Sequence, residues 1–168
     1  MNEPAVYKNY FENYTSLVSE KEILSAFNGQ SQTFNDFLNS ITEEKSDYAY
    51  AESKWTLKEM LQHMIDTERI FAFRALAIAR KETVTLPGFD ENLYVANSSA
   101  NRRTWAELVQ EMKIVRESTI ILIKSFTEEM LNTSGNFSAA TASVNTLGNI
   151  IVGHFYHHVN IANTRYLI

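Results

Sequence analysis

The sequence predicts an all-α fold, most simply a four-helix bundle. Several long segments carry apolar residues at helical spacing, and no stretch shows the alternation and turn dipeptides typical of strands. The chain has 168 residues but only five glycines and two prolines, which argues against a loop-rich fold of many strands. This length fits a single domain, residues 1–168, with its own hydrophobic core. Residues 1–18, rich in Tyr and Phe, are expected to pack against the bundle as an irregular arm.

The first two helices are expected at about residues 20–41 and 57–81. The first carries an apolar set at mostly helical spacings and is preceded by Ser19 and Glu22, which fit the S-x-x-E capping box. The second begins after Thr56, with Glu59 three residues later, and its apolar stripe is long. Both patterns are typical of amphipathic helices that turn one face to a core.

The third and fourth helices are expected at about residues 105–126 and 146–166. Thr104 and Glu107 form another capping-box pattern before the third. The connections between helices two and three (82–103) and between helices three and four (127–143) are too long for tight turns. Long connections allow crossings that short loops forbid in a bundle.

The composition excludes several function classes. A formal charge of −5 and a pI near 5.4 give no basic face for nucleic acid. The absence of cysteine excludes disulfides and thiolate ligands, so nitrogen and oxygen must hold any metal, and any reacting thiol must come from outside. No signal pattern is present, which makes the cytoplasm the expected compartment. The uncharged run 146–164 contains three histidines and three asparagines, so we interpret it as a buried helix and not a membrane span.

Three of the four histidines lie within the stretch GHFYHH, residues 153–158. His154 and His158 are one helical turn apart and share the apolar face of the fourth helix, so their imidazoles can point at one ion. His157 should flank them. The fourth histidine, His63, lies at the edge of the apolar stripe of the second helix. The three histidines His63, His154 and His158 would leave open positions on a metal, which is the catalytic pattern.

The alternative is that these histidines only hydrogen-bond within the core, and spacing alone leaves both interpretations open. Asp66 follows His63 by about one turn and could orient a ligand imidazole or accept a proton. Glu68 is a weaker candidate, and a solvated or ion-paired helix face is the alternative for both. Trp55 and Trp105 are expected to be packing anchors.

Three segments together resemble the DinB/YfiT-like family of metalloenzymes, part of the DinB superfamily. They read KWTLKEMLQHMIDTERIFAFRAL, LPGFDENLYV and GNIIVGHFYHHVNIANTRYL, and they extend in order from about Tyr48 to the end of the chain. The resemblance implies a bundle with up-down-down-up connectivity in a bacterial protein that is often dimeric. It also implies a divalent metal, commonly nickel, zinc or iron, on three histidines that match His63, His154 and His158. One departure is Phe155, which replaces the glutamate of related GHExHH motifs.

Relatives in this family include thiol S-transferases and a thiol-dependent maleylpyruvate isomerase. The resemblance therefore implies transfer of an external low-molecular-weight thiol to a small electrophilic molecule, with Asp66 or His157 as proton relay. The alternatives are a metal-dependent hydrolase and a non-enzymatic helical homodimer with a vestigial site. The face of the fourth helix around Gly153 is polar but uncharged, which indicates that another segment packs on it. We expect that segment to be a second subunit or the N-terminal arm.

Overall fold

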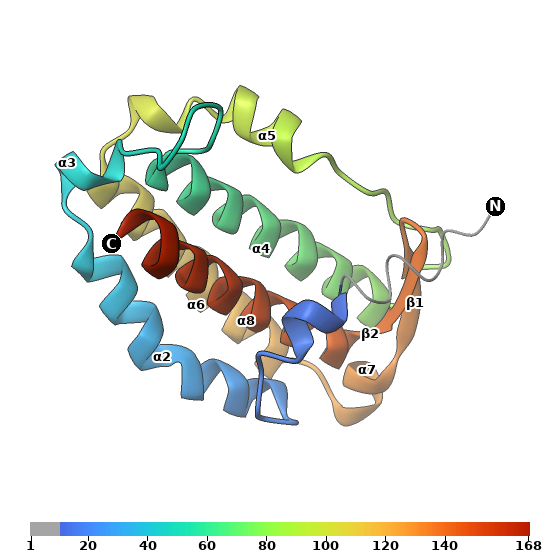
Figure 1. The fold of residues 1–168 in the computed structure, drawn as a ribbon. Coiled ribbons are helices and arrows are strands. Elements are labelled where there is room, and N and C mark those ends of the chain that lie inside the picture. Colours follow the sequence, from blue (N-terminus) through green and yellow to red (C-terminus); the bar gives the residue numbers. More distant parts are fainter. Residues whose placement is uncertain (1–10) are drawn as a thin grey trace.

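Four long helices make up most of the fold in the computed structural model, which describes residues 11–168 (Figure 1). They are α2 (Ile23–Ser40), α4 (Leu57–Ala79), α6 (Trp105–Lys124) and α8 (Val144–Ile161). Beyond α8 the chain continues as a π-helical turn, η2 (Ala162–Tyr166). The expected four-helix bundle is therefore confirmed. The boundaries of α2, α4 and α6 lie within three residues of the predicted ones, and the predicted end of the fourth helix, residue 166, is the end of η2 and not of α8.

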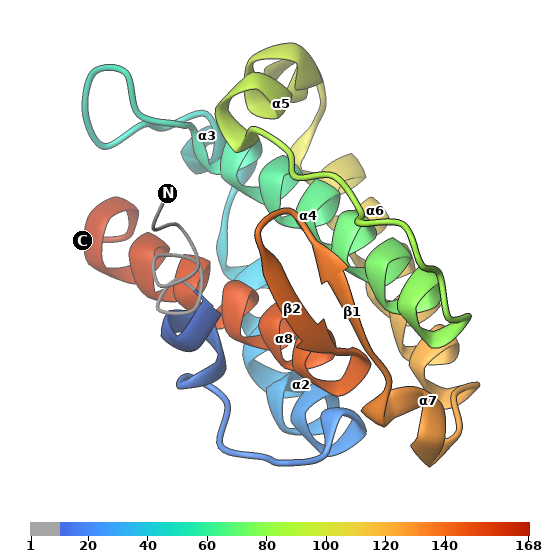
Figure 2. The ribbon, with the colours of Figure 1, turned by 90° about the vertical axis from the view of Figure 1, so that its right-hand side faces the viewer.

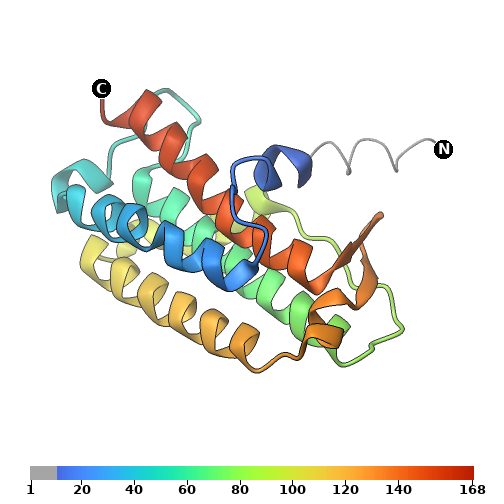
Figure 3. The same cartoon turned by 90° about the horizontal axis from the view of Figure 1, so that it is seen from below.

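The helices follow the up-down-down-up order. In Figure 1, α4 and α6 run in the same direction, while α2 and α8 run in the opposite one. Helix α4 packs against α6 and α8, and α2 packs against the same two helices from the other side. Figure 3 shows α2 (blue to cyan) between α6 (yellow to orange) and α8 (red). This arrangement puts α4 and α8, which carry all four histidines, side by side.

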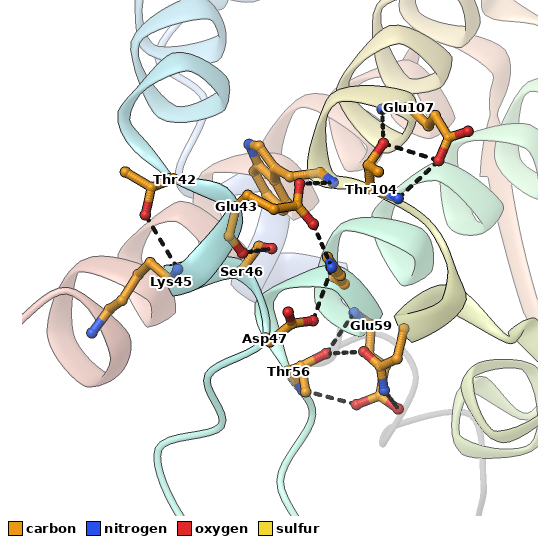
Figure 4. Close-up of polar contacts among 12 residues, drawn as sticks. Thr42, Glu43, Lys45, Ser46, Asp47, Thr56, Glu59, Thr104 and Glu107 are labelled. Carbon is orange, nitrogen blue, oxygen red and sulfur yellow. Dashed lines mark hydrogen bonds and ion pairs between the residues drawn. The ribbon is translucent and has the colours of Figure 1, made fainter.

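Local sequence signals set the starts of α4 and α6. Thr56 accepts a hydrogen bond from the amide of Glu59, whose carboxylate accepts one in return from the Thr56 amide, and Thr104 and Glu107 repeat the arrangement (Figure 4). Such boxes satisfy amides that a helix start leaves without partners. The box expected at Ser19 is wrong, because α2 begins at Ile23 after Glu22, which makes no side-chain cap.

The long connections contain structure that the sequence pattern did not predict. A short helix, α3 (Glu43–Ser46), precedes α4. The connection from α4 to α6 holds α5 (Glu91–Ser98) and a 3-10 turn, η1 (Ala100–Arg102). The one from α6 to α8 holds α7 (Glu128–Asn132) and an antiparallel hairpin, β1 (Ser134–Phe137) and β2 (Ala140–Ser143).

The hairpin lies along α4 and α8 (Figure 2). Leu86, in the α4–α5 connection, exchanges backbone hydrogen bonds with it: its amide donates to the carbonyl of Asn136, and the amide of Ser138 donates to its carbonyl. The two long connections are thereby joined to each other beside α4. They form the rim of the cavity described below.

A buried ion pair between α6 and α4 lies in the core. Arg116 of α6 donates to both carboxylate oxygens of Glu68 on α4, and its Nη1 donates to Oε1 of Gln30 on α2. Gln30 in turn donates to the carbonyl of Val152 on α8. This network connects all four long helices and fixes how they pack, because each buried polar group in it has a partner.

The N-terminal arm is described from residue 11 onward, so the predicted arm of residues 1–18 lies partly outside the described residues. Residues 11–15 form a helical turn, where an irregular segment was expected. Among residues 11–168, none of the helices has the length and apolar character needed to span a bilayer.

Candidate metal centre

The packing of α4 against α8 brings three histidines together. His63 comes from the middle of α4, and His154 and His158 come from successive turns of α8. The Nε2 atom of His154 lies 3.0 Å from Nε2 of His63 and 3.0 Å from Nε2 of His158. Ligand atoms of all three lie within 4.8 Å of one another. All three side chains are buried, with exposed fractions of 5–7%.

Hydrogen bonds alone do not account for this cluster. A ring nitrogen of neutral histidine carries either one hydrogen or one lone pair, so it makes one good hydrogen bond. Nε2 of His154 nevertheless faces two other Nε2 atoms at the same distance. A cation that accepts a lone pair from each ring satisfies all three. Nitrogen ligands at about 2.0–2.1 Å from one ion lie about 3 Å apart, which matches the two distances measured from Nε2 of His154.

The electrostatics of the cluster also suit a cation. Burial, with a smaller contribution from His157, lowers the pKa of His63 to about 4. Burial likewise lowers the pKa values of His154 and His158 well below the usual value, and the neighbouring histidines add to the effect. At neutral pH the three rings are therefore uncharged and their lone pairs are free to bind a metal. The residues present thus fit a divalent metal.

His157 flanks the three histidines, as the helical spacing predicted. Its half-buried ring lies 5.1 Å, between centroids, from the ring of His158 and 5.3 Å from that of Tyr14. Burial lowers its pKa. The ring is therefore close to the site without contributing an atom to the cluster.

Asp66 is not brought to the histidines. Its carboxylate accepts a hydrogen bond from Gln62 and is influenced by Arg69, Glu111 and Arg103, on the side of α4 that faces α5 and α6. Burial raises its pKa. Its suggested contact with a ligand imidazole is absent from the structure.

Phe155, at the position of the departure from the family motif, is a core residue. Its ring packs 4.9 Å from that of Phe34 and 5.8 Å from that of Phe37, and the guanidinium of Arg116 lies over it. It faces α2 and α6 and not the Nε2 cluster. The substitution therefore leaves the ligand set unaltered.

The N-terminal arm packs on α8 at Gly153, which is one of the two covers expected for that face, and it also contacts two of the histidines. The backbone of Tyr14 lies directly against Gly153, so close that a Cβ there would be 2.0 Å from the Tyr14 carbonyl oxygen. The Tyr14 ring contacts both His154 and His157, at 5.3 Å between centroids in each case. Glycine at position 153 is what allows this approach.

A cavity of about 340 Å³ opens beside the cluster. Two of the histidines, His63 and His154, form part of its wall. The rest of the wall comes from the arm, from α4, from the two long connections and from α8, namely Phe11, Tyr14, Thr67, Phe71, Arg74, Gly88, Phe89, Glu91, Phe137, Ser138 and Ile150. A second cavity of about 230 Å³ reaches His158 and is lined also by Trp55, Tyr50 and Tyr166. The three histidines therefore lie between these two cavities.

Sequence reasoning missed several residues of this site. Tyr14 was not singled out. Arg74 was expected, with Arg69, on a solvated or ion-paired helix face, yet it is buried, and His63, Thr67, Phe71 and Arg74 follow one another at helical spacing along one side of α4. Trp55 was expected to be a packing anchor and does pack, with its ring 4.9 Å from that of His63.

The comparisons with known proteins agree with this fold. The sequence profile of the DinB superfamily matches residues 26–162. YfiT from Bacillus subtilis, described as a probable metal-dependent hydrolase with an unusual four-helix bundle topology, superimposes with a TM-score of 0.72 at 12% identity, over 84% of this chain and 85% of that one. A DinB-like protein from Bacillus subtilis, YjoA, gives a TM-score of 0.57 at 20% identity, over 84% and 87%. At these identities the two structures show a shared fold. No curated protein sequence matches significantly.

Proposed function

Because the chain belongs to the DinB superfamily, we propose that it is a metal-dependent enzyme that transfers an external low-molecular-weight thiol to a small electrophilic substrate. The observation that carries the proposal is the convergence of three buried, neutral imidazoles on one point at the wall of a cavity. Nickel, zinc or iron is the proposed metal, since imidazole suits each of them.

A divalent ion on three histidines keeps open positions and lowers the pKa of a thiol or water bound to it. Two cavities give separate access to the histidine cluster. His63 and His154 face the larger cavity, and His158 faces the smaller one. Two reactants can thus reach the centre from different sides, as a bimolecular transfer requires.

The surroundings favour a thiol over water as the nucleophile. Hydrolysis normally uses a general base within hydrogen-bond reach of the attacking water. Within residues 11–168, no carboxylate forms a hydrogen bond or ion pair with the three histidines: Asp66 pairs with Gln62, and Glu68 with Arg116. A thiol bound to a metal ionises near neutral pH without such a base. The absence of cysteine from the chain then requires that the thiol be a second substrate.

His157 is the residue we propose to relay to solvent the proton that the thiol releases when it binds. It is half-buried and one residue from His158, so it can exchange protons with solvent while it stays close to the centre. Asp66 has no such position and is not part of this proposal.

Metal-dependent hydrolysis is the second candidate. It is favoured by the description of YfiT, which has the same fold. A third possibility, a helical homodimer that binds metal without catalysis, follows from the same ligand set.

Measuring the metal content tests the metal site on which all three candidate functions depend. We expect the wild-type protein to bind one divalent ion per chain and the His63→Ala, His154→Ala and His158→Ala variants to lose it. The matched control is His157→Ala, which should keep the metal because its ring lies outside the cluster. If the three ligand variants keep stoichiometric metal by elemental analysis, the proposed centre is wrong.

Activity separates the candidates. The metal-loaded protein is incubated with an aryl halide electrophile and a panel of thiols that includes bacillithiol, mycothiol, cysteine and coenzyme A. Thiol-dependent adduct formation that is lost in His154→Ala supports the transferase. Ester or amide cleavage without added thiol supports the hydrolase. Neither activity in a metal-loaded protein that is dimeric by light scattering would favour the non-enzymatic alternative.

A further inference from the structure

The larger cavity contains a buried cation that has no acidic partner in the described part of the chain. Arg74 of α4 is 4% exposed, and its one side-chain hydrogen bond within residues 11–168 runs from Nη2 to the carbonyl oxygen of Pro87, at 2.8 Å. The other buried arginine of the bundle, Arg116, is neutralised by Glu68. Arg74 thus differs from it in having no carboxylate within ion-pair distance.

Aromatic rings partly compensate this buried charge. The guanidinium carbon lies 4.9 Å from the ring centre of Phe71, 4.7 Å from that of Phe137 and 5.9 Å from that of Phe89. Such cation–π contacts recover only part of the cost of burying an unpaired charge. Burial accordingly lowers the pKa of Arg74. The arrangement is stabilised further if an anion enters the cavity.

Arg74 and the histidines occupy the same cavity along one side of α4. From His63 to Arg74 the helix rises about 16 Å, and the arginine side chain leans back toward the helix start. A molecule on the order of 10 Å long can therefore contact both the histidine cluster and the Arg74 guanidinium. Between them the wall is apolar and aromatic, formed largely by Phe71 and Phe137.

We propose that this cavity binds a monocarboxylate with an apolar or aromatic body, its carboxylate on Arg74 and its opposite end at the histidine cluster. This assignment rests on the function proposed above and names the substrate class for it. One cation balances one negative charge, whereas a phosphate dianion would leave charge uncompensated in an apolar wall. Since Pro87 occupies Nη2, the remaining donors of the guanidinium are available to carboxylate oxygens.

Among the described residues that line the cavity, the one carboxylate belongs to Glu91, an exposed residue of α5. It forms no ion pair with Arg74 in the structure. A bound carboxylate would be repelled by it and attracted by Arg74, so the two residues provide substitutions of opposite expected effect. Glu91→Gln is the matched control for Arg74→Gln, because both replace a charged cavity residue with the same neutral side chain.

The test is isothermal titration calorimetry with hydrocinnamate and its neutral amide, hydrocinnamamide, without thiol, so that no reaction is needed. Wild-type protein should bind the acid at least about tenfold more tightly than the amide, the size expected for hydrogen bonds to a charged group. Arg74→Gln should reduce that preference to about twofold or less, and Glu91→Gln should keep or increase it.

Each titration is repeated after treatment with a chelator, because a metal could itself attract the carboxylate. A preference that survives chelation belongs to Arg74 and supports the proposal. The proposal is overturned if acid and amide bind equally, if wild type binds neither at millimolar concentration, or if the preference disappears with the metal. If Arg74→Gln does not fold by circular dichroism, the chelated wild-type comparison decides. Thiol-transfer activity is measured separately, so that its absence would count against the enzyme and not against this site.

Discussion

Replacing Gly153 with alanine should destabilise the protein, although alanine is the better helix former. Gly153 lies inside α8, where a glycine costs about 1 kcal/mol relative to alanine. A Cβ at this position would lie 2.0 Å from the carbonyl oxygen of Tyr14, 2.5 Å from its carbonyl carbon and 3.1 Å from its Cα. These are backbone atoms, so no side-chain rotation relieves the contact.

The size of the effect follows from how far the arm must move. Side-chain Cβ atoms essentially never approach within 3.0 Å of another heavy atom, so the Tyr14 backbone must shift by about 1 Å. That shift disturbs the contacts of the Tyr14 ring, which is 7% exposed and packs on His154 and His157. Overpacking costs about 1–3 kcal/mol, and this contact belongs in the upper part of that range, about 2–3 kcal/mol, because backbone atoms cannot rotate away from it. After the gain of about 1 kcal/mol from helix propensity, we expect a net loss of about 1–2 kcal/mol.

Gly29→Ala is the matched control. Gly29 is also inside a helix, α2, but it is exposed, and the nearest contact of an added Cβ is Oε1 of Glu20 at 2.9 Å, the end of a flexible side chain. This substitution should stabilise the protein by about 0.5–1 kcal/mol. The two alanine variants are therefore expected to change stability in opposite directions.

Urea denaturation and thermal unfolding measure the difference. For a chain of this size, about 1–2 kcal/mol corresponds to a fall in Tm of roughly 2–8 °C for Gly153→Ala. Chymotrypsin should also cleave the arm near Tyr14 faster in this variant. If Gly153→Ala is as stable as Gly29→Ala, with unchanged cleavage, the arm does not lie against α8 as described.

Further predictions follow from the buried polar groups and the helix start. Glu68→Ala should cost about 3–5 kcal/mol by urea denaturation because it leaves Arg116 buried without a counter-charge, and combining it with Arg116→Met should recover much of the loss. Burial, with Tyr50 and Glu59 contributing, raises the pKa of Tyr166 to about 12, so the folded protein keeps this proton when the unfolded chain loses it. Stability should thus be complete below about pH 10 and fall by up to about 2–3 kcal/mol as pH rises toward 12, a dependence that Tyr166→Phe should lack in parallel unfolding curves. Thr56→Ala removes the cap of α4 and should cost about 1 kcal/mol, while Thr56→Ser should cost little; equal stability of the two variants would argue against the cap.

Features that depend on local spacing were predictable from the sequence. The capping boxes at Thr56 and Thr104 fixed two helix starts, and both are confirmed. The four-residue spacing of His154 and His158 placed both imidazoles on one side of α8, because a helix repeats every 3.6 residues. His157 was correctly placed beside the pair for the same reason.

Features that depend on packing between distant segments were less predictable. Helical spacing offered His63 as a third ligand but left the choice open until the family resemblance supported it, since spacing on one helix does not say which helices meet. Asp66 has a plausible spacing from His63, yet the packing of α5 and α6 draws its side chain to Gln62 and the neighbouring charges. The hairpin at 134–143 escaped prediction because its strands have four residues each and no clear alternation.

Local sequence was enough to predict four amphipathic helices, the absence of cysteine ligands, and a histidine pair placed to share one ion. Tertiary structure alone decided that the arm closes over Gly153, that the two long connections join beside α4, and that Arg74 shares a cavity with His63. The physical reason is the range of the interactions. Helix periodicity and capping are fixed within a few residues, whereas a cavity between an arm, a hairpin and two helices exists only once each has packed against the others.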